Sequence, residues 1–333
     1  MVERREKLTP QNVAKICESI FHQPVEKITA PGGKSRESLR VHFATHTIIA
    51  TQRAYSGRMR LEVEVLRRLS EGGAPVPKFL GGTEQVFFQQ DVGARRLSSQ
   101  LADADARSGQ NIAARAFASL IQIHEAGEQA ELHQIVPKLG AEKPWVAGFV
   151  NSALAASDRY KISAPTIDFG AITERLHVPC ARFLKWDARP GNASIGHDGR
   201  VYWFDWEHCG ARQGMEDFAW LAGDEFFPLG ASEVVAILTN LLGPKLTAPE
   251  LEYLGIFTTF HIVQRLIIIH RRFEKVGWVD VKNAMKLDKI GVDRALAVRL
   301  CDHGEEWADL SPQTRSMKRW FKDCAKTLEA MAR

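Results

Sequence analysis

A predicted β-hairpin with polar residues at its open end constrains this chain more than any other feature. Two apolar runs lie on either side of the segment 196–199, which contains an Asp-Gly step, and this is a strong hairpin signal. Asn192 enters the first strand and Asp205 leaves the second, so antiparallel pairing brings both residues to the same end. A carboxamide oxygen and a carboxylate suit a hard cation such as Mg2+, which takes its other ligands from phosphate and water.

Asp187 stands just before this hairpin, where a carboxylate can accept a proton from a hydroxyl that attacks a metal-bound phosphate. The run from Asp187 to Asn192 reads Asp-x-Arg-Pro-x-Asn, and Asp205 opens an Asp-Trp-Glu motif. Together they resemble the catalytic loop and metal-binding Asp of the kinase superfamily. They are most similar to its aminoglycoside phosphotransferase and choline kinase branch.

The resemblance implies an α+β, bilobal protein-kinase-like fold, with an antiparallel N-lobe sheet carrying one helix and a mainly helical C-lobe. It implies an ATP-dependent phosphotransferase that moves the γ-phosphoryl group to a hydroxyl of a small molecule, such as an amino sugar, a sugar or an amino alcohol. By the family pattern Asp187 is the base, Arg189 lies near the transferred phosphoryl, and Asn192 and Asp205 hold Mg2+.

Periodicity along the first 91 residues agrees with such an N-lobe. Alternating apolar residues predict strands, and apolar residues at helical spacing predict helices. The expected helices are 9–21 and 59–69, and the expected strands are 39–43, 47–53, 79–80 and 86–89. After Gly93 the chain is predominantly helical apart from the hairpin. We therefore expect lobes at 1–91 and 92–333.

Gly32, Gly33 and Ser35 lie between strand-like segments, at the position of the phosphate loop in the resembled family. Paired glycines let backbone amides approach a phosphate closely. A plain hairpin turn is the alternative explanation.

The strand 47–53 has no lysine to pair with the α- and β-phosphates and with a helix glutamate. Arg53 is the candidate cation, although Gln52 occupies the adjacent register and points to the opposite face. The family pattern Glu-x-x-x-Leu-Arg-x-Leu selects Glu62 as its partner, with Glu64 as the fallback. Backbone groups of Gln90 or Asp91 are expected to read the adenine edge.

Lys185 occupies the position where this branch usually has histidine, two residues before Asp187. Its charge is expected to lower the pKa of Asp187; alternatively, it replaces positive charge near the phosphates. Asp217 resembles the buried aspartate that braces the catalytic loop in this family. Glu207 is expected to be a local brace, with contact to the metal as the alternative, and His124 a helix histidine without ligand duty.

An acidic, aromatic segment follows Asp217 and is a candidate acceptor cleft, which would suit a cationic acceptor. Ordinary packing of the C-lobe explains the same residues and is the favoured alternative. The residues concerned are Trp220, Asp224, Glu225, Phe226 and Phe227.

Composition sets further expectations. The 333 residues carry a formal net charge of +4, and no basic stripe indicates nucleic acid. Five scattered cysteines, the lack of a signal-peptide pattern and the lack of any expected membrane-spanning segment favour a cytoplasmic protein with no membrane partner. The sequence does not indicate an oligomeric state.

Two other functions compete with the small-molecule kinase. The atypical strand 47–53 and Lys185 favour a nucleotide-binding pseudokinase with a regulatory or scaffolding role, whereas Asp187, Asn192 and Asp205 oppose it. A protein kinase is less consistent with the sequence, because no long activation loop separates Asp205 from Asp217.

Overall fold

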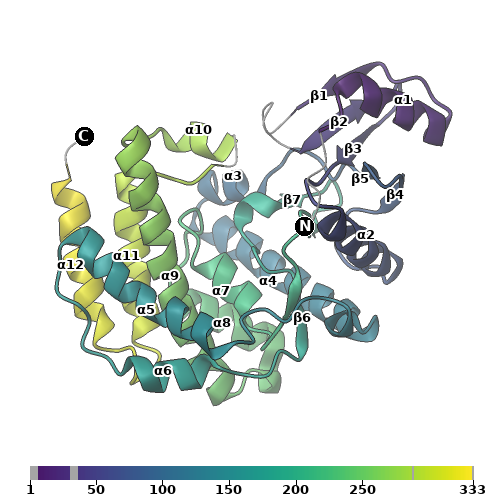
Figure 1. Ribbon diagram of the computed structural model, residues 1–333. Helices are drawn as coiled ribbons and strands as arrows, with labels where there is room; N and C mark the ends of the chain where they lie inside the picture. The colour runs from purple at the N-terminus through teal and green to yellow at the C-terminus, as the bar shows by residue number, and fades with distance from the viewer. Residues whose placement is uncertain (1–6, 31–36, 287–288, 332–333) are drawn as a thin grey trace.

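The computed structural model describes residues 7–30, 37–286 and 289–331. Figure 1 shows a sheet-containing N-terminal part at one end of the molecule and a larger helical part beside it. This arrangement confirms the predicted α+β fold. The expected phosphate-loop residues Gly32, Gly33 and Ser35 lie outside the described residues.

The N-terminal sheet has five antiparallel strands in the order β1-β2-β3-β5-β4. Helices α1 and α2 lie beside it, and alternation along β5 divides its side chains between two cores. Phe88 packs with Val13 and Cys17 of α1, whereas Phe87 belongs to the core shared with α2 and the helical part. The elements are α1 (Pro10–Phe21), β1 (Lys27–Thr29), β2 (Ser38–His42), β3 (Thr47–Thr51), α2 (Ser56–Glu71), β4 (Phe79–Gly82) and β5 (Phe87–Gln90).

The predicted elements of this part differ from the observed ones mainly at their ends. Strand β3 ends at Thr51, two residues before the predicted limit, so Arg53 lies in the connection to α2. Helix α2 is longer at both ends than the predicted 59–69. The short strand β1 was not among the strands located by alternation, because three residues give too little periodicity.

The rest of the chain is mostly helical and contains two small antiparallel ribbons, β6 with β9 and β7 with β8. The ribbons are formed by β6 (Arg182–Leu184), β7 (Ala193–Ile195), β8 (Val201–Trp203) and β9 (Gly210–Arg212). The helices are α3 (Leu97–Ala102), α4 (Ala106–Gln129), α5 (Lys143–Tyr160), α6 (Phe169–Leu176), α7 (Glu216–Ala222), α8 (Ala231–Leu242), α9 (Ala248–Val276), α10 (Val281–Lys286), α11 (Arg294–Ala308) and α12 (Met317–Ala330).

Helix α9 is the central helix of this part. A capping box between Thr247 and Glu250 begins it, and it packs against α5, α7 and α11. The sequence predicted no segment as long as a membrane span, but the 29 residues of α9 are long and apolar enough to cross a membrane. However, 83% of its most apolar window is buried inside the protein, as expected of a core helix.

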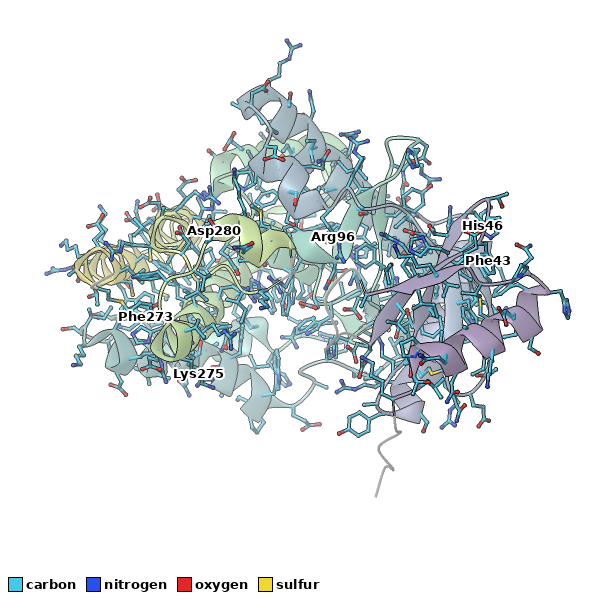
Figure 2. The ribbon with its side chains drawn as sticks, turned by 90° about the horizontal axis from the view of Figure 1, so that it is seen from above. Phe43, His46, Arg96, Phe273, Lys275 and Asp280 are labelled. Atoms are coloured by element: carbon cyan, nitrogen blue, oxygen red, sulfur yellow. The ribbon has the colours of Figure 1, made fainter. Side chains whose placement is uncertain are left out.

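Arg96 lies at the junction between the two parts (Figure 2). Phe43 and His46, whose stacked rings are 4.8 Å apart, lie to one side of it in the turn between β2 and β3. Phe273, at the end of α9, lies to the other side. Arg96 therefore marks where the two parts of the chain meet.

Candidate active site

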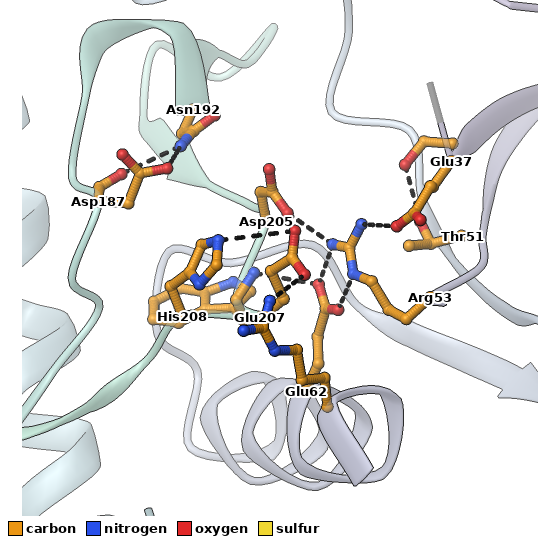
Figure 3. Close-up of polar contacts among 12 residues, drawn as sticks. Glu37, Thr51, Arg53, Glu62, Asp187, Asn192, Asp205, Glu207 and His208 are labelled. Carbon is orange, nitrogen blue, oxygen red and sulfur yellow. Dashed lines mark hydrogen bonds and ion pairs between the residues drawn. The ribbon is translucent and has the colours of Figure 1, made fainter. Parts of the chain in front are cut away.

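The β7–β8 hairpin forms as predicted and brings its two polar ends together. Ala193 pairs with Trp203, and the N–H of Phe204 donates to the carbonyl of Asn192 at 3.1 Å. Asn192 and Asp205 therefore leave the ribbon at the same end. The Asn192 amide Nδ2 donates to the Asp187 carboxylate at 2.8 Å (Figure 3).

Left-handed backbone conformations occur at three residues of this site. The φ angles are 52° at Trp186, 49° at Asp187 and 64° at Asp205, a region that costs L-residues roughly 1–2 kcal/mol each. Such angles persist only where surrounding contacts impose them.

Asp217 supplies such contacts from the start of α7. Its fully buried carboxylate accepts hydrogen bonds from the backbone N–H groups of Lys185 at 2.8 Å and Trp186 at 2.7 Å. His124 Nε2 lies 2.8 Å from the same carboxylate. Asp217 thus holds the segment that leads into Asp187.

Lys185 is fully buried beneath the site. Its Nζ donates to the carbonyl of Asp205 at 3.0 Å and lies 5.3 Å from the centre of the Trp206 ring. The pKa of Asp187 is raised, whereas the sequence predicted that Lys185 would lower it. Burial raises this pKa, and the charges of Lys185 and Arg189 offset only part of that rise. A raised pKa makes the carboxylate a stronger proton acceptor.

Arg53 forms the polar centre of the N-terminal side. Its guanidinium binds Glu62 through two hydrogen bonds, of 2.6 and 2.8 Å, and donates to Asp205 at 2.6 Å (Figure 3). Burial lowers the pKa of Arg53, but the charges of Glu62 and Asp205 raise it by more, so the group stays charged. Gln52 instead accepts from the N–H of Leu8, at 2.8 Å.

Glu64, the other candidate for helix partner, and Glu207, the expected local brace, are partly exposed. Glu64 pairs with Arg67 and Arg68 along α2, not with Arg53. Glu207 lies 3.5 Å from Arg58 and 3.8 Å from His208 (Figure 3).

A cavity of about 960 Å3 lies between the N-terminal sheet and the helical part. Arg53, Asn192 and Asp205 line it together with Gln90 and Asp91. The Gln90 N–H already donates to Lys78, and the Asp91 carboxylate is bound by Arg40 and Thr47. The expectation that backbone groups of Gln90 or Asp91 read the adenine edge stays a prediction, and both residues line the cavity.

Arg96 also lines this cavity and was missed by sequence reasoning. Its guanidinium donates to the carbonyl of Gly191 and lies 4.8 Å from the centre of the Phe204 ring, between the two ends of the hairpin. Arg96 precedes Gly191 by 95 residues and belongs to no local motif, so the sequence carried no signal for it.

Arg189 joins a buried group of charges. Its Nε lies 2.7 Å from Asp224, and Arg265 binds Glu225 at 2.7 Å. Asp224 and Glu225 are 0% and 1% exposed, which fits the packing interpretation of this segment and not an open acidic cleft. Both carboxylates are already neutralised by arginines.

The oxygen atoms at the hairpin end fit a magnesium ion. Because Asn192 Nδ2 donates to Asp187, Oδ1 is the amide atom that remains to ligate, and Asn192 lines the same cavity as Asp205. Among the described residues, no group of three or more His, Cys, Asp or Glu could hold a metal.

Comparison with known proteins identifies the fold. No family model matches the chain, and no curated protein matches its sequence. Spectinomycin phosphotransferase, solved with ADP and spectinomycin, is 10% identical and superposes with a TM-score of 0.55 over 98% of this chain and 99% of its own. An amicoumacin kinase solved with AMP-PNP, Ca2+ and amicoumacin is 14% identical, with a TM-score of 0.57 over 92% and 96%.

An aminoglycoside-3'-phosphotransferase of type VIII is also similar, at 17% identity and a TM-score of 0.51 over 75% of this chain and 97% of its own. At these identities the likeness concerns the fold alone. The chain has the bilobal fold of the aminoglycoside phosphotransferases and related small-molecule kinases.

Proposed function

We propose that this protein is an ATP-dependent phosphotransferase that moves the γ-phosphoryl group to a hydroxyl of a small molecule. The observation that carries the proposal is the convergence of Asp187, Asn192 and Asp205 at one end of the hairpin, beside the 960 Å3 cavity. The lobes of this enzyme would be residues 1–91 and 92–333, with the cavity between them.

Each residue has a role that its contacts support. Asp187 accepts the proton of the attacking hydroxyl, and its raised pKa favours that step. Asn192 and Asp205 would hold Mg2+, which offsets phosphate charge when bound. Arg53 supplies a further cation, and Glu62 orients it. Arg189, bound to Asp224, acts at longer range by offsetting charge near Asp187.

A binding measurement tests the nucleotide half of this proposal. Titration calorimetry with AMP-PNP should detect binding that is much tighter with Mg2+ than with EDTA, because the site presents two oxygen ligands to a metal-bound triphosphate. Equal affinity in both conditions would contradict the assigned metal ligands. ADP release during a screen of metabolite hydroxyls, against a control without acceptor, tests transfer itself.

A nucleotide-binding pseudokinase is the second candidate, and one contact favours it. Arg53 lies 2.6 Å from Asp205, so a cation already engages the carboxylate that would bind the metal. Under this alternative the protein binds AMP-PNP without Mg2+ and produces no ADP with any acceptor or with water alone. The same two measurements therefore separate the candidates.

A further inference from the structure

A second cavity, of about 490 Å3, lies in the helical part beside the catalytic loop. It shares no lining residue with the first cavity. Most of its wall is aromatic and comes from α5, α7, α9 and the residue before Asp187. The principal side chains are Trp145, Phe149, Trp186, Trp220, Phe257 and His261.

This cavity is close to the proposed base. Trp186 lines it and directly precedes Asp187 in the chain. Arg265, which also lines it, is near enough for its charge to influence Asp187. A ligand in this cavity would lie near Asp187 and would contact none of the residues that line the first cavity.

The charges around the cavity do not suit a polycation. None of its described lining residues is a carboxylate, and Arg265 is the charged member of the set. The nearby Glu225 is bound to Arg265, and Asp224 is bound to Arg189. Amino sugars need carboxylates to replace the water around their ammonium groups, and none is offered here.

A quaternary ammonium group fits no better. The guanidinium of Arg212 already lies 5.3 Å from the centre of the Trp145 ring and 5.9 Å from that of Phe257. Two of the rings available to a ligand cation therefore already have the Arg212 guanidinium beside them. A trimethylammonium head would also fill only a small part of 490 Å3.

His261 supplies a polar group inside the aromatic wall. It is 3% exposed, its ring centre lies 4.3 Å from that of Trp220, and its Nε2 has no hydrogen-bond partner among the described residues. Burial lowers the pKa of His261 well below its usual value, so the imidazole is neutral. An unpaired buried nitrogen is costly unless something binds it, and a ligand hydroxyl or carbonyl can.

Gly148 keeps one side of the cavity open. It lies within α5, where glycine costs roughly 0.5–1 kcal/mol relative to alanine, yet nothing lies within 4 Å of the position of an added Cβ. Neither packing nor a positive φ requires glycine at this position. Gly148 is exposed and lines the cavity, so a large side chain at this position would occupy space at the edge of the cavity.

We propose that this cavity is the acceptor site and that it takes a flat, uncharged aromatic ring bearing a hydroxyl-carrying substituent. The ring packs among Trp186, Trp220 and Phe149, and His261 binds a polar atom of the substituent. The inference rests on the proposed kinase function. In the transfer step, the acceptor oxygen bonds to the γ-phosphorus, its proton passes to Asp187, and the bond from the γ-phosphorus to the bridging oxygen breaks to release ADP.

The test uses 2-naphthyl β-D-glucopyranoside as the aromatic probe, with kanamycin and choline as cationic probes, in titration calorimetry. Wild-type protein should bind the glucoside more tightly than either cation. Gly148→Leu, which fills the open side, should weaken glucoside binding at least tenfold. Ala155→Leu, at an exposed position of the same helix, should leave it unchanged. AMP-PNP binding with Mg2+ should be the same in all three proteins.

The proposal is overturned if the wild type does not bind the glucoside, if Gly148→Leu binds it equally well, or if a cationic probe binds more tightly. Failure of the kinase function has a different signature. Normal glucoside binding without any AMP-PNP binding would exclude the acceptor role while leaving an aromatic binding cavity.

Discussion

Arg53 binds Glu62 with both arms of its guanidinium fork, and the same Nη2 atom that binds Glu62 also donates to Asp205 at 2.6 Å. One side chain thus connects helix α2 to the end of the β8 strand, across 152 residues of sequence. The N-terminal and helical parts are therefore joined electrostatically at the place where we propose that phosphates bind. Lysine could offer one charge there but not a planar fork.

The first prediction follows from that fork. Arg53→Ala should weaken Mg-AMP-PNP binding by about one to two orders of magnitude, because a charge-assisted contact is worth roughly 1.5–3 kcal/mol. It should also destabilise the protein by about 3–5 kcal/mol, because Glu62 is 1% exposed and would lose its charged partner. Calorimetry and urea unfolding measure the two effects.

A double variant separates these effects. Arg53→Ala with Glu62→Ala should regain much of the stability but not the affinity, and Arg53→Lys should regain part of the affinity. Gln52→Ala is the matched control, since Gln52 contacts Leu8 instead. Loss of affinity in the Gln52 variant with a silent Arg53→Ala would show that the wrong residue was assigned.

The second prediction concerns Asp187 and Asp205. Asp187→Ala should lower turnover by on the order of a hundredfold or more and leave Mg-AMP-PNP affinity nearly intact, because the base acts on the acceptor. Asp205→Ala should lower both, because we assign it to the metal. Steady-state kinetics and calorimetry on the same preparations provide the comparison. An Asp187 variant with wild-type turnover would remove this residue from the mechanism.

The third prediction concerns the brace below the catalytic loop. Asp217→Asn replaces one carboxylate oxygen by an NH2 group that faces a backbone N–H, which should cost about 1–3 kcal/mol of stability. Because Trp186 and Asp187 depend on this brace for their left-handed backbone, turnover should fall at least tenfold. His124→Gln leaves both backbone bonds in place and should have a smaller effect. Equal turnover of Asp217→Asn and wild type would contradict the brace.

The fourth prediction is a pH dependence of stability. Burial, with a further contribution from Arg299, lowers the pKa of His303 from 6.5 to about 4. The unfolded chain then binds a proton between these values that the folded protein does not, so this part of the stability is complete above pH 6.5 and is lost as the pH falls towards 4. The loss amounts to about 3 kcal/mol.

Urea unfolding of wild type and His303→Gln across pH 4 to 7 measures this contribution. The variant lacks the titrating group, so its stability should fall less steeply below pH 6.5. Parallel pH profiles for the two proteins would rule out His303 as the source.

Local patterns predicted what local contacts determine. The hairpin that joins Asn192 to Asp205 follows from a turn signal between two apolar runs, and the structure forms it with the expected register. The pairing of Arg53 with Glu62, nine residues apart, was predicted from the resemblance to the kinase family and not from local chemistry. The hairpin depends on neighbouring residues, so alternation and turn chemistry were sufficient to predict it.

Features that depend on distant partners could not be predicted in this way. The sequence places Asp224 and Glu225 in an acidic segment, but it does not indicate that Arg265, some 40 residues later, neutralises it. The net pKa shift of Asp187 likewise depends on burial, which outweighs the adjacent Lys185. The sequence gives the charge of each side chain, but it does not give the burial or the distant partners that determine its pKa.

The buried course of helix α9 has a consequence for synthesis on the ribosome. Its apolar faces need α5 and α7, which are translated earlier, and α11, which is translated later. For the time needed to make about 30 further residues, a helix apolar enough for a bilayer leaves the exit tunnel with part of its cover missing. A released chain truncated before Arg294 should therefore bind chaperones strongly, and the complete chain, which contains α11, should not.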